Sequence, residues 1–157
     1  MFNLSNLEKK DIFIDIPESE FKAIIFYVIR NSRLAQKENI FRGIIDREQL
    51  GSTSIGNNTA IPHCRLKDFD YFYVKFILFK KRLGYYAPNG EEIRYVFLVF
   101  GSNADNAYYI NTLAHIAKVM KNPNLRKNLL QTNNEKEVCR LFRKYAQTEL
   151  EEMHVWK

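Results

Sequence analysis

Residues 46–63 read DREQLGSTSIGNNTAIPH, and this stretch separates a helical N-terminal part of the chain from a strand-rich central part. Its middle, residues 51–59, is rich in Gly, Ser, Thr and Asn, which favour turns over helix. Pro62 biases Ile61 towards an extended conformation, because the residue before a proline avoids the helical region. The stretch therefore predicts a turn-rich loop whose backbone is constrained just before His63.

Two amphipathic helices are predicted before this loop, over residues 18–34 and 37–47. In each, apolar residues recur with the spacing of one helix face. Pro17 suits the first helical position, where its missing N–H leaves no helical bond unmade. The apolar positions are Phe21, Ile24, Ile25, Val28 and Ile29 in the first helix, and Ile40, Ile44 and Ile45 in the second.

Strands and further helices are predicted after the loop. Residues 71–79 and 93–100 are rich in aromatic and β-branched residues, which favour strands, and the turn residues 87–90 lie between them. A helix is expected over about 104–121, with Pro123 breaking its pattern. A last helix is expected over about 135–146, because Asn134 and Glu137 resemble a capping arrangement.

The order of these elements predicts one α/β domain with helices packed on a sheet. We expect the domain to span residues 1–157, with a core over about 5–147 and a C-terminal tail over 148–157. A chain of 157 residues is long enough to bury a core without disulfides or metal.

Composition narrows the compartment and the class of partner. No apolar run approaches the ~20 residues that span a bilayer, and the N-terminus lacks the apolar stretch of a signal peptide. Cys64 and Cys139 have no metal-ligand spacing, so we expect reduced thiols in a cytoplasmic protein that is not membrane-inserted. The net charge of +6 is scattered in short groups, which favours a solvated surface over a nucleic-acid partner.

Of the three histidines, His63 has the surroundings of a reactive group. The preceding loop offers hydroxyls and backbone N–H groups that suit an oxyanion. A neutral imidazole is a good nucleophile near neutral pH, and phosphoryl transfer mainly requires alignment and charge stabilisation. The chain has no GxxxxGK[ST] loop for ATP, and the chemistry requires no metal and no cofactor.

Residues 46–63 resemble the signature of the IIA component of the bacterial phosphoenolpyruvate-dependent sugar phosphotransferase system, fructose/mannitol type, which includes the nitrogen-regulatory IIA proteins. The match ends at Ile61-Pro62-His63, and weaker likeness extends over nearly the whole chain. The resemblance implies a single domain with a mixed β-sheet of about five strands, flanked by helices on both faces. It also implies that His63 accepts a phosphoryl group from an HPr-type carrier and passes it to a IIB domain of a sugar permease.

The resemblance also gives supporting roles to residues near His63. Arg47 would pair with an acid or steady the phosphate, although a cation at a helix end is equally compatible with its position. Thr53 would offer a hydroxyl or orient the loop, and Asn57 would contact the phosphate. For Thr53 and Asn57, an ordinary turn residue is the alternative.

Departures from the family pattern leave a second function open. Tyr109 stands where the family has a second histidine; tyrosine can donate a hydrogen bond but carries no positive charge. Ser54 and Asn58 replace two family glycines. His115 is out of register and is expected to be a packing or surface residue, and Cys64 an inert thiol or a redox-sensitive one. The alternative is a transfer-impaired regulatory module that binds a kinase or transporter by contact.

Overall fold

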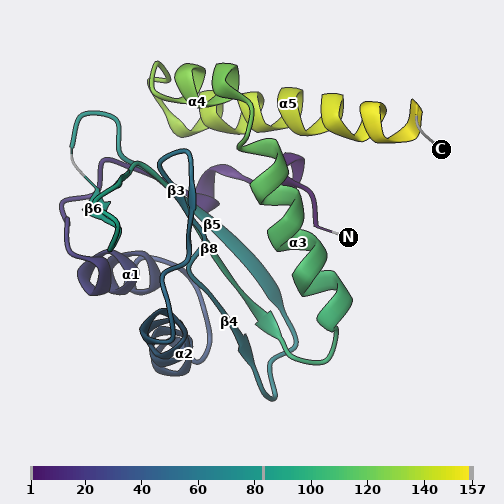
Figure 1. Ribbon diagram of the computed structural model, residues 1–157. Coiled ribbons are helices and arrows are strands. Elements are labelled where there is room, and N and C mark those ends of the chain that lie inside the picture. The colour runs from purple at the N-terminus through teal and green to yellow at the C-terminus, as the bar shows by residue number, and fades with distance from the viewer. Residues whose placement is uncertain (1, 83, 156–157) are drawn as a thin grey trace.

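The computed structural model describes residues 2–82 and 84–155, with side chains through residue 147. Figure 1 shows a sheet with helices on either side and α5 extending from one corner. In chain order the elements are η1 (Leu4–Asn6), η2 (Lys9–Asp11), β1 (Ile12–Ile14), α1 (Phe21–Arg30), α2 (Lys37–Gln49), β2 (Ser54–Gly56), β3 (Thr59–Ala60), β4 (His63–Leu66), β5 (Phe72–Leu78), β6 (Tyr85–Tyr86), β7 (Glu92–Ile93), β8 (Tyr95–Ser102), α3 (Asn106–Val119), α4 (Pro123–Leu129) and α5 (Glu135–Val155).

A mixed sheet forms the middle layer, with strand order β1-β5-β8-β3-β2. β8 pairs antiparallel with β5 on one side. On its other side it pairs in parallel with β3 near its start and with β4 towards its end. Because β3 and β4 follow one another along the same edge of β8, the sheet is about five strands wide, which confirms the predicted architecture.

Alternating side chains of β5 and β8 build one hydrophobic core on each face of the sheet. Phe76 and Phe97 belong to the core under α3, α4 and α5. Ile77 and Leu98 belong to the core under α1 and α2. Successive strand residues point to opposite faces, so two apolar runs supply both cores, and Figure 1 shows the helices divided accordingly.

Close packing of α2 on β4 brings the end of that helix beside His63. Gly43 lies at the contact, where an added Cβ would be 3.1 Å from the Cys64 sulfur and 3.2 Å from its Cβ. The missing side chain therefore lets the helix lie directly on the strand. Four residues later, Arg47 occupies the last turn of the same helix.

The predicted loop contains a β-hairpin that the sequence analysis did not foresee. β2 and β3 pair antiparallel, with Ser54 opposite Ala60. Asn57 and Asn58 form its two-residue turn and have φ of 55° and 57°. Positive φ at both central positions is the geometry of the turn that matches the twist of a hairpin, and Asn tolerates it well.

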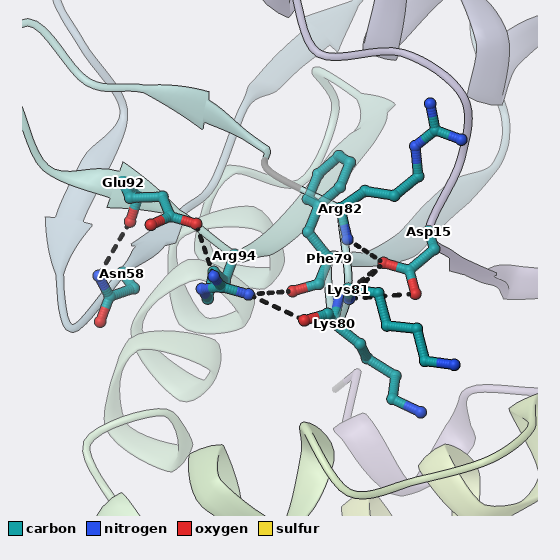
Figure 2. A network of polar contacts seen from close by, with 8 residues as sticks. All are labelled: Asp15, Asn58, Phe79, Lys80, Lys81, Arg82, Glu92 and Arg94. Carbon is teal, nitrogen blue, oxygen red and sulfur yellow. Dashed lines mark hydrogen bonds and ion pairs between the residues drawn. The ribbon is translucent and has the colours of Figure 1, made fainter.

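A network of polar contacts fastens this hairpin to the strands beside it, as Figure 2 shows. The Asn58 carbonyl accepts the N–H groups of Arg94 at 2.9 Å and Tyr95 at 3.1 Å. The Arg94 guanidinium forms an ion pair with Glu92 at 2.9 Å. It also donates to the Phe79 carbonyl at 3.1 Å, so the turn is joined to the end of β5.

The Asp15 carboxylate organises the basic turn that follows β5 (Figure 2). It accepts three successive backbone N–H groups, from Lys80 at 2.7 Å, Lys81 at 3.1 Å and Arg82 at 3.2 Å. Asp15 itself has a φ of 49°, which turns the chain at the end of β1. The acid therefore joins the turn after β1 to the turn after β5.

The first helices differ at their ends from the sequence prediction. α1 begins at Phe21 rather than residue 18, because the Glu20 side chain accepts the N–H groups of Lys22 and Ala23 and caps the helix. The prediction that Pro17 takes the first helical position is therefore wrong. α1 also ends at Arg30, while α2 runs two residues beyond the predicted 47.

The later elements also show corrections. Arg94 separates β7 from β8, so the strand predicted over 93–100 is divided between two sheets. Pro123 ends the predicted helix pattern but also starts α4, capped by Asn122. The capping role of Asn134 is confirmed, since its side chain accepts the Glu137 N–H at 3.0 Å. α5 continues to Val155, beyond the predicted 146, and β1 and β4 were not predicted.

Candidate functional site

His63 begins β4, at the edge of the sheet between α2 and α3 (Figure 1). The ring is half-buried, and its Nδ1 lies 2.6 Å from the Ile61 carbonyl oxygen. A carbonyl only accepts, so Nδ1 carries the proton and donates it. Nε2 is therefore the ring nitrogen with a free lone pair.

The surroundings of the ring favour its neutral form. Burial lowers the pKa of His63 below 6.5, and the nearby guanidinium groups of Arg47 and Arg65 lower it further. The hydrogen bond to the Ile61 carbonyl and the Glu48 carboxylate act in the opposite direction without cancelling the effect. A neutral imidazole at neutral pH is the nucleophilic form.

Two open depressions meet at His63, which together with Arg47 lines both. The larger, of about 740 Å³, is lined by polar and apolar atoms in similar measure and lies between α2 and the start of α3. The smaller, of about 420 Å³, is more apolar and lies between the loop after α2 and the middle of α3. The larger is lined by Gly43, Asp46, Arg47, Leu50, His63, Cys64, Arg65, Asn103 and Tyr109.

Arg47 occupies the end of α2 and also borders the site of His63. Its guanidinium donates to the Gly51 carbonyl at 2.9 Å, which closes the end of α2. It also faces both depressions. Among the described residues no carboxylate forms an ion pair with it, so its positive charge remains available to an anion beside His63.

Thr53 lines the smaller depression, but its hydroxyl is bound to Glu48 and so orients the loop. Its Oγ1 donates to Glu48 Oε2 at 2.6 Å, and its N–H donates to Glu48 Oε1 at 3.1 Å. Its carbonyl accepts the Ile61 N–H at 3.0 Å. Since the Ile61 carbonyl in turn holds the His63 ring, Thr53 links the end of α2 to the imidazole.

Asn57 is not brought to the site. It forms the tip of the β2–β3 hairpin, where its carbonyl accepts the Thr59 hydroxyl at 3.0 Å. It does not line either depression at His63. The structure therefore gives Asn57 the turn-forming role that was the alternative to a phosphate contact.

Tyr109 lies in the first turn of α3 and packs against His63. Its side chain is buried, and the two ring centroids are 5.7 Å apart in an edge-to-face arrangement. Burial raises the pKa of Tyr109, so the hydroxyl stays neutral at physiological pH. None of the hydrogen bonds among the described residues joins this hydroxyl to His63.

Two site residues escaped the sequence analysis. Arg65 lines the larger depression, and alternation along β4 would have placed it on the same face as His63, two residues away. Glu48 stands inside the signature stretch, but its part became visible only from its two bonds to Thr53. That carboxylate holds the loop and also raises the pKa of His63.

His115 and Cys64 have structural roles, as the simpler interpretations predicted. His115 is buried, and its Nε2 accepts the Leu4 N–H at 3.1 Å, which fastens η1 to α3. Cys64 points into the core under α2, and burial raises its pKa to about 12, so the thiol stays protonated.

No helix in the described part of the chain has the length and apolar character to cross a membrane. Residues 2–82 and 84–155 contain no group of three or more His, Cys, Asp or Glu side chains suited to a metal ion.

Comparison with known proteins agrees with the fold and with the family resemblance. A nitrogen regulatory protein of Bradyrhizobium diazoefficiens is 27% identical over 90 residues, which cover 57% of this chain and 59% of the relative. The matched part thus spans about three fifths of that relative's length.

Two solved structures share the fold. The nitrogen regulatory protein IIA-Ntr from Neisseria meningitidis superposes with a TM-score of 0.77 at 23% identity, over 88% of this chain and 97% of that one. Enzyme IIA mannitol of Escherichia coli, in complex with phosphorylated enzyme IIB mannitol, has a TM-score of 0.66 at 19% identity, over 87% and 96%.

The family assignment comes from the sequence match over most of the chain. Residues 5–145 match the model of the EIIA 2 family of the phosphoenolpyruvate-dependent sugar phosphotransferase system. This range includes the hairpin, the His63 site and all buried residues of the two cores except Leu4 and Ala146. The chain therefore belongs to the EIIA 2 family of that phosphotransferase system.

Proposed function

We propose that this protein is a phosphocarrier in which His63 Nε2 accepts a phosphoryl group from an HPr-type donor and hands it on. The observation that carries the proposal is a neutral, half-buried imidazole with Nδ1 bound to the Ile61 carbonyl, beside two arginines that have no carboxylate partner among the described residues. The fixed tautomer leaves one nucleophilic nitrogen, and the arginines favour an incoming phosphoryl group electrostatically.

The transfer step conserves atoms and charge. The phosphorus–nitrogen bond of the donor phosphohistidine breaks as a bond from phosphorus to His63 Nε2 forms, and the donor imidazole leaves with its electron pair. The Nδ1 proton of His63 stays on the bond to the Ile61 carbonyl. In onward transfer or hydrolysis the bond from phosphorus to Nε2 breaks as a bond to the acceptor's nucleophile or to water forms, and the electron pair returns to Nε2.

Exposed apolar side chains around His63 support docking of protein partners at this site. Leu50 is 85% exposed, Ile55 42% and Ile110 52%, and all three line the depressions that contain His63. Apolar patches of this kind mark contact surfaces. We infer that an HPr-type carrier and a IIB domain dock here in turn, as the complex of the mannitol relatives suggests. We place this exchange in the cytoplasm.

A regulatory role is the second candidate, and Tyr109 is the observation that favours it. A neutral tyrosine beside His63 stabilises a phosphoryl group less than a cation would, so slow transfer would suit a switch. In that case the phosphorylation state of His63 controls contact with a kinase or transporter. The similarity to nitrogen regulatory proteins supports this branch.

The test is phosphorylation with purified enzyme I, an HPr-type carrier and phosphoenolpyruvate. We expect a mass increase of about 80 Da, one acid-labile phosphoryl group, in the wild type and in the matched control His115→Gln. His63→Gln should remain unlabelled. Equal labelling of His63→Gln, or no labelling of the wild type, would refute the proposal.

The regulatory branch is tested on the same proteins. If phosphorylation acts as a switch, a candidate kinase or transporter domain should bind the unphosphorylated and the phosphorylated protein with affinities that differ at least tenfold. Equal affinities would leave phosphoryl transfer to a IIB domain as the function. Calorimetry on both forms measures this difference.

A further inference from the structure

Arg65 is a cation of the larger depression that the loop signature does not include. It follows His63 by two residues on β4, so the two side chains leave the same face of the strand. Two residues span about 6.6 Å along a strand, which an arginine side chain covers easily. Arg65, Arg47 and His63 line one depression.

The guanidinium of Arg65 is held in place without being neutralised. It donates to Asn106 Oδ1 at the start of α3, and its central carbon lies 5.4 Å from the centroid of the Tyr109 ring. Among the described residues it has no carboxylate in an ion pair. A guanidinium has five N–H donors, so after the bond to Asn106 a pair of donors remains for two oxygens of an anion.

Tyr109 is placed to fix the direction of that guanidinium. The side chain is only 6% exposed and packs edge-to-face against Phe72 at 6.4 Å. Its ring also packs edge-to-face with the His63 ring, so one buried aromatic side chain contacts both the nucleophile and the arginine. A ring held on two sides restricts the directions in which the guanidinium can point.

We propose that Arg65 binds the equatorial oxygens of the phosphoryl group on His63, opposite Arg47, and that Tyr109 is a positioning residue that acts through Arg65. The inference rests on the proposed function and extends it. Arg65 takes up no proton and forms no covalent bond. Its N–H groups bind oxygens that gain charge as the bond to phosphorus changes from the donor to Nε2.

The test uses phosphoramidate, a small donor that needs no protein partner. Its phosphorus–nitrogen bond breaks and ammonia leaves as the bond from Nε2 to phosphorus forms, so the rate reports contacts with the phosphoryl group rather than docking. Arg65→Ala should slow labelling of His63 about 10- to 100-fold, the value of hydrogen bonds to a charged group. Arg65→Lys keeps the charge but loses the paired donors. Its labelling rate should therefore lie between those of the wild type and Arg65→Ala.

The matched control is Arg42→Ala, which removes a positive charge from α2 at a residue that pairs with Glu38 on the surface. It should label at the wild-type rate. If Arg42→Ala slows labelling as much as Arg65→Ala, net charge explains the effect and the role of Arg65 is refuted.

A double-mutant cycle tests the role of Tyr109. Tyr109→Leu should slow labelling more than Tyr109→Phe, since phenylalanine keeps the ring face under the guanidinium. In the Arg65→Ala background, Tyr109→Leu should add little, because residues that act through one another are not additive. Fully additive effects would show that Tyr109 acts independently of Arg65.

Titration of the His63 ring by NMR gives a readout that does not depend on transfer. Arg65→Ala should raise the pKa of His63, and Tyr109→Leu should raise it less, because each moves positive charge away from the imidazole. A wild type that is never labelled refutes the proposed function. A labelled wild type with Arg65→Ala at the same rate and the same pKa overturns only the inference about Arg65.

Discussion

At the scale of single residues, the charge of His63 depends on groups of opposite sign at the end of α2. Arg47 lowers the pKa of the ring and Glu48 raises it. We therefore expect Arg47→Ala to raise the pKa, because a cation that disfavours imidazolium is lost. Glu48→Gln should lower it. NMR titration of the imidazole measures both, and an opposite sign in either variant would contradict the arrangement.

His115 makes the stability of the protein depend on pH. Burial lowers its pKa below 6.5, and Lys118 lowers it further, so the unfolded chain takes up a proton first. The free energy of unfolding should therefore fall as pH drops through 6.5 towards the lower native pKa. His115→Leu should flatten this dependence, and denaturation at pH 7.5 and 5.5 measures it.

His115→Leu should also destabilise the protein at neutral pH. Without the imidazole, the Leu4 N–H loses its acceptor, which should lower the free energy of unfolding by about 1–3 kcal/mol. The pH dependence that remains belongs in part to His63, whose pKa is also lowered. If the free energy of unfolding of His115→Leu depends on pH as in the wild type, protonation of His115 does not contribute to that dependence.

Single residues differ in how far the sequence could place them. His63 was predicted from the residues of the loop before it, and Arg47 from the family resemblance of the same stretch. The resemblance gave Thr53 a loop-orienting role, but its partner Glu48 was not named, because residue types alone do not show which acid accepts its hydrogen bonds. Arg65 was within reach, because strand alternation relates it to His63, but β4 itself was not predicted.

At the scale of secondary-structure elements, the contact between α2 and β4 limits the size of residue 43. Gly43→Ala gains about 1 kcal/mol of helix propensity, but overpacking costs about 1–3 kcal/mol. Cys64 is buried on a strand that is paired with β8, so it cannot easily move away from an added methyl group. We expect a net loss of about 1 kcal/mol in the free energy of unfolding.

Chemical denaturation measures this effect, and a double-mutant cycle identifies its source. In the background of Cys64→Ala the loss caused by Gly43→Ala should be smaller, because the sulfur at 3.1 Å is gone. A stabilised Gly43→Ala would show that α2 moves freely on β4. The position of Arg47 relative to His63 would then be adjustable as well.

Substitutions in the hairpin turn test whether Asn57 acts through its positive φ, as its turn-forming role requires. Asn57→Ala should lower the free energy of unfolding by about 1 kcal/mol, because alanine is unfavourable at a φ of 55°. Asn57→Gly should lower it much less, since glycine adopts positive φ freely. Thermal denaturation of both variants measures this. Equal losses would show that the amide of Asn57, rather than its backbone, matters.

Elements were predicted best where apolar residues recur regularly or β-branched and aromatic residues cluster. α2 and α3 follow from periodicity and β5 from its residue types, each within about two residues of its ends. The hairpin escaped because its strands are two or three residues long and pair through the backbone. The start of α1 was misplaced because the Glu20 carboxylate accepts the first N–H groups, so the helix begins after Glu20 and Pro17 lies outside it.

At the scale of the whole molecule, β5 and β8 belong to both cores, so the two layers should unfold together. Phe142 packs from α5 against Phe76, with ring centroids 4.9 Å apart. Phe142→Ala should lower the free energy of unfolding by about 3–5 kcal/mol. Circular dichroism with urea should show one transition at lower denaturant, whereas two separate transitions would mean independent layers.

The control for this prediction is a phenylalanine of the other layer. Phe26 is 54% exposed, so Phe26→Ala should change the free energy of unfolding by less than about 1 kcal/mol.

The α/β class was predicted from the order of the helices and strands along the chain. The mixed sheet with helices on both faces came from the family resemblance, because strand pairing between distant segments is not visible in local patterns.

The bond of Asp15 to the turn after β5 has a consequence for selectivity. The three N–H groups of residues 80–82, together with their basic side chains, would otherwise attract free phosphate. The carboxylate is a tethered competitor whose effective concentration is in the millimolar range or above. We therefore expect inorganic phosphate below that concentration to bind poorly at residues 80–82.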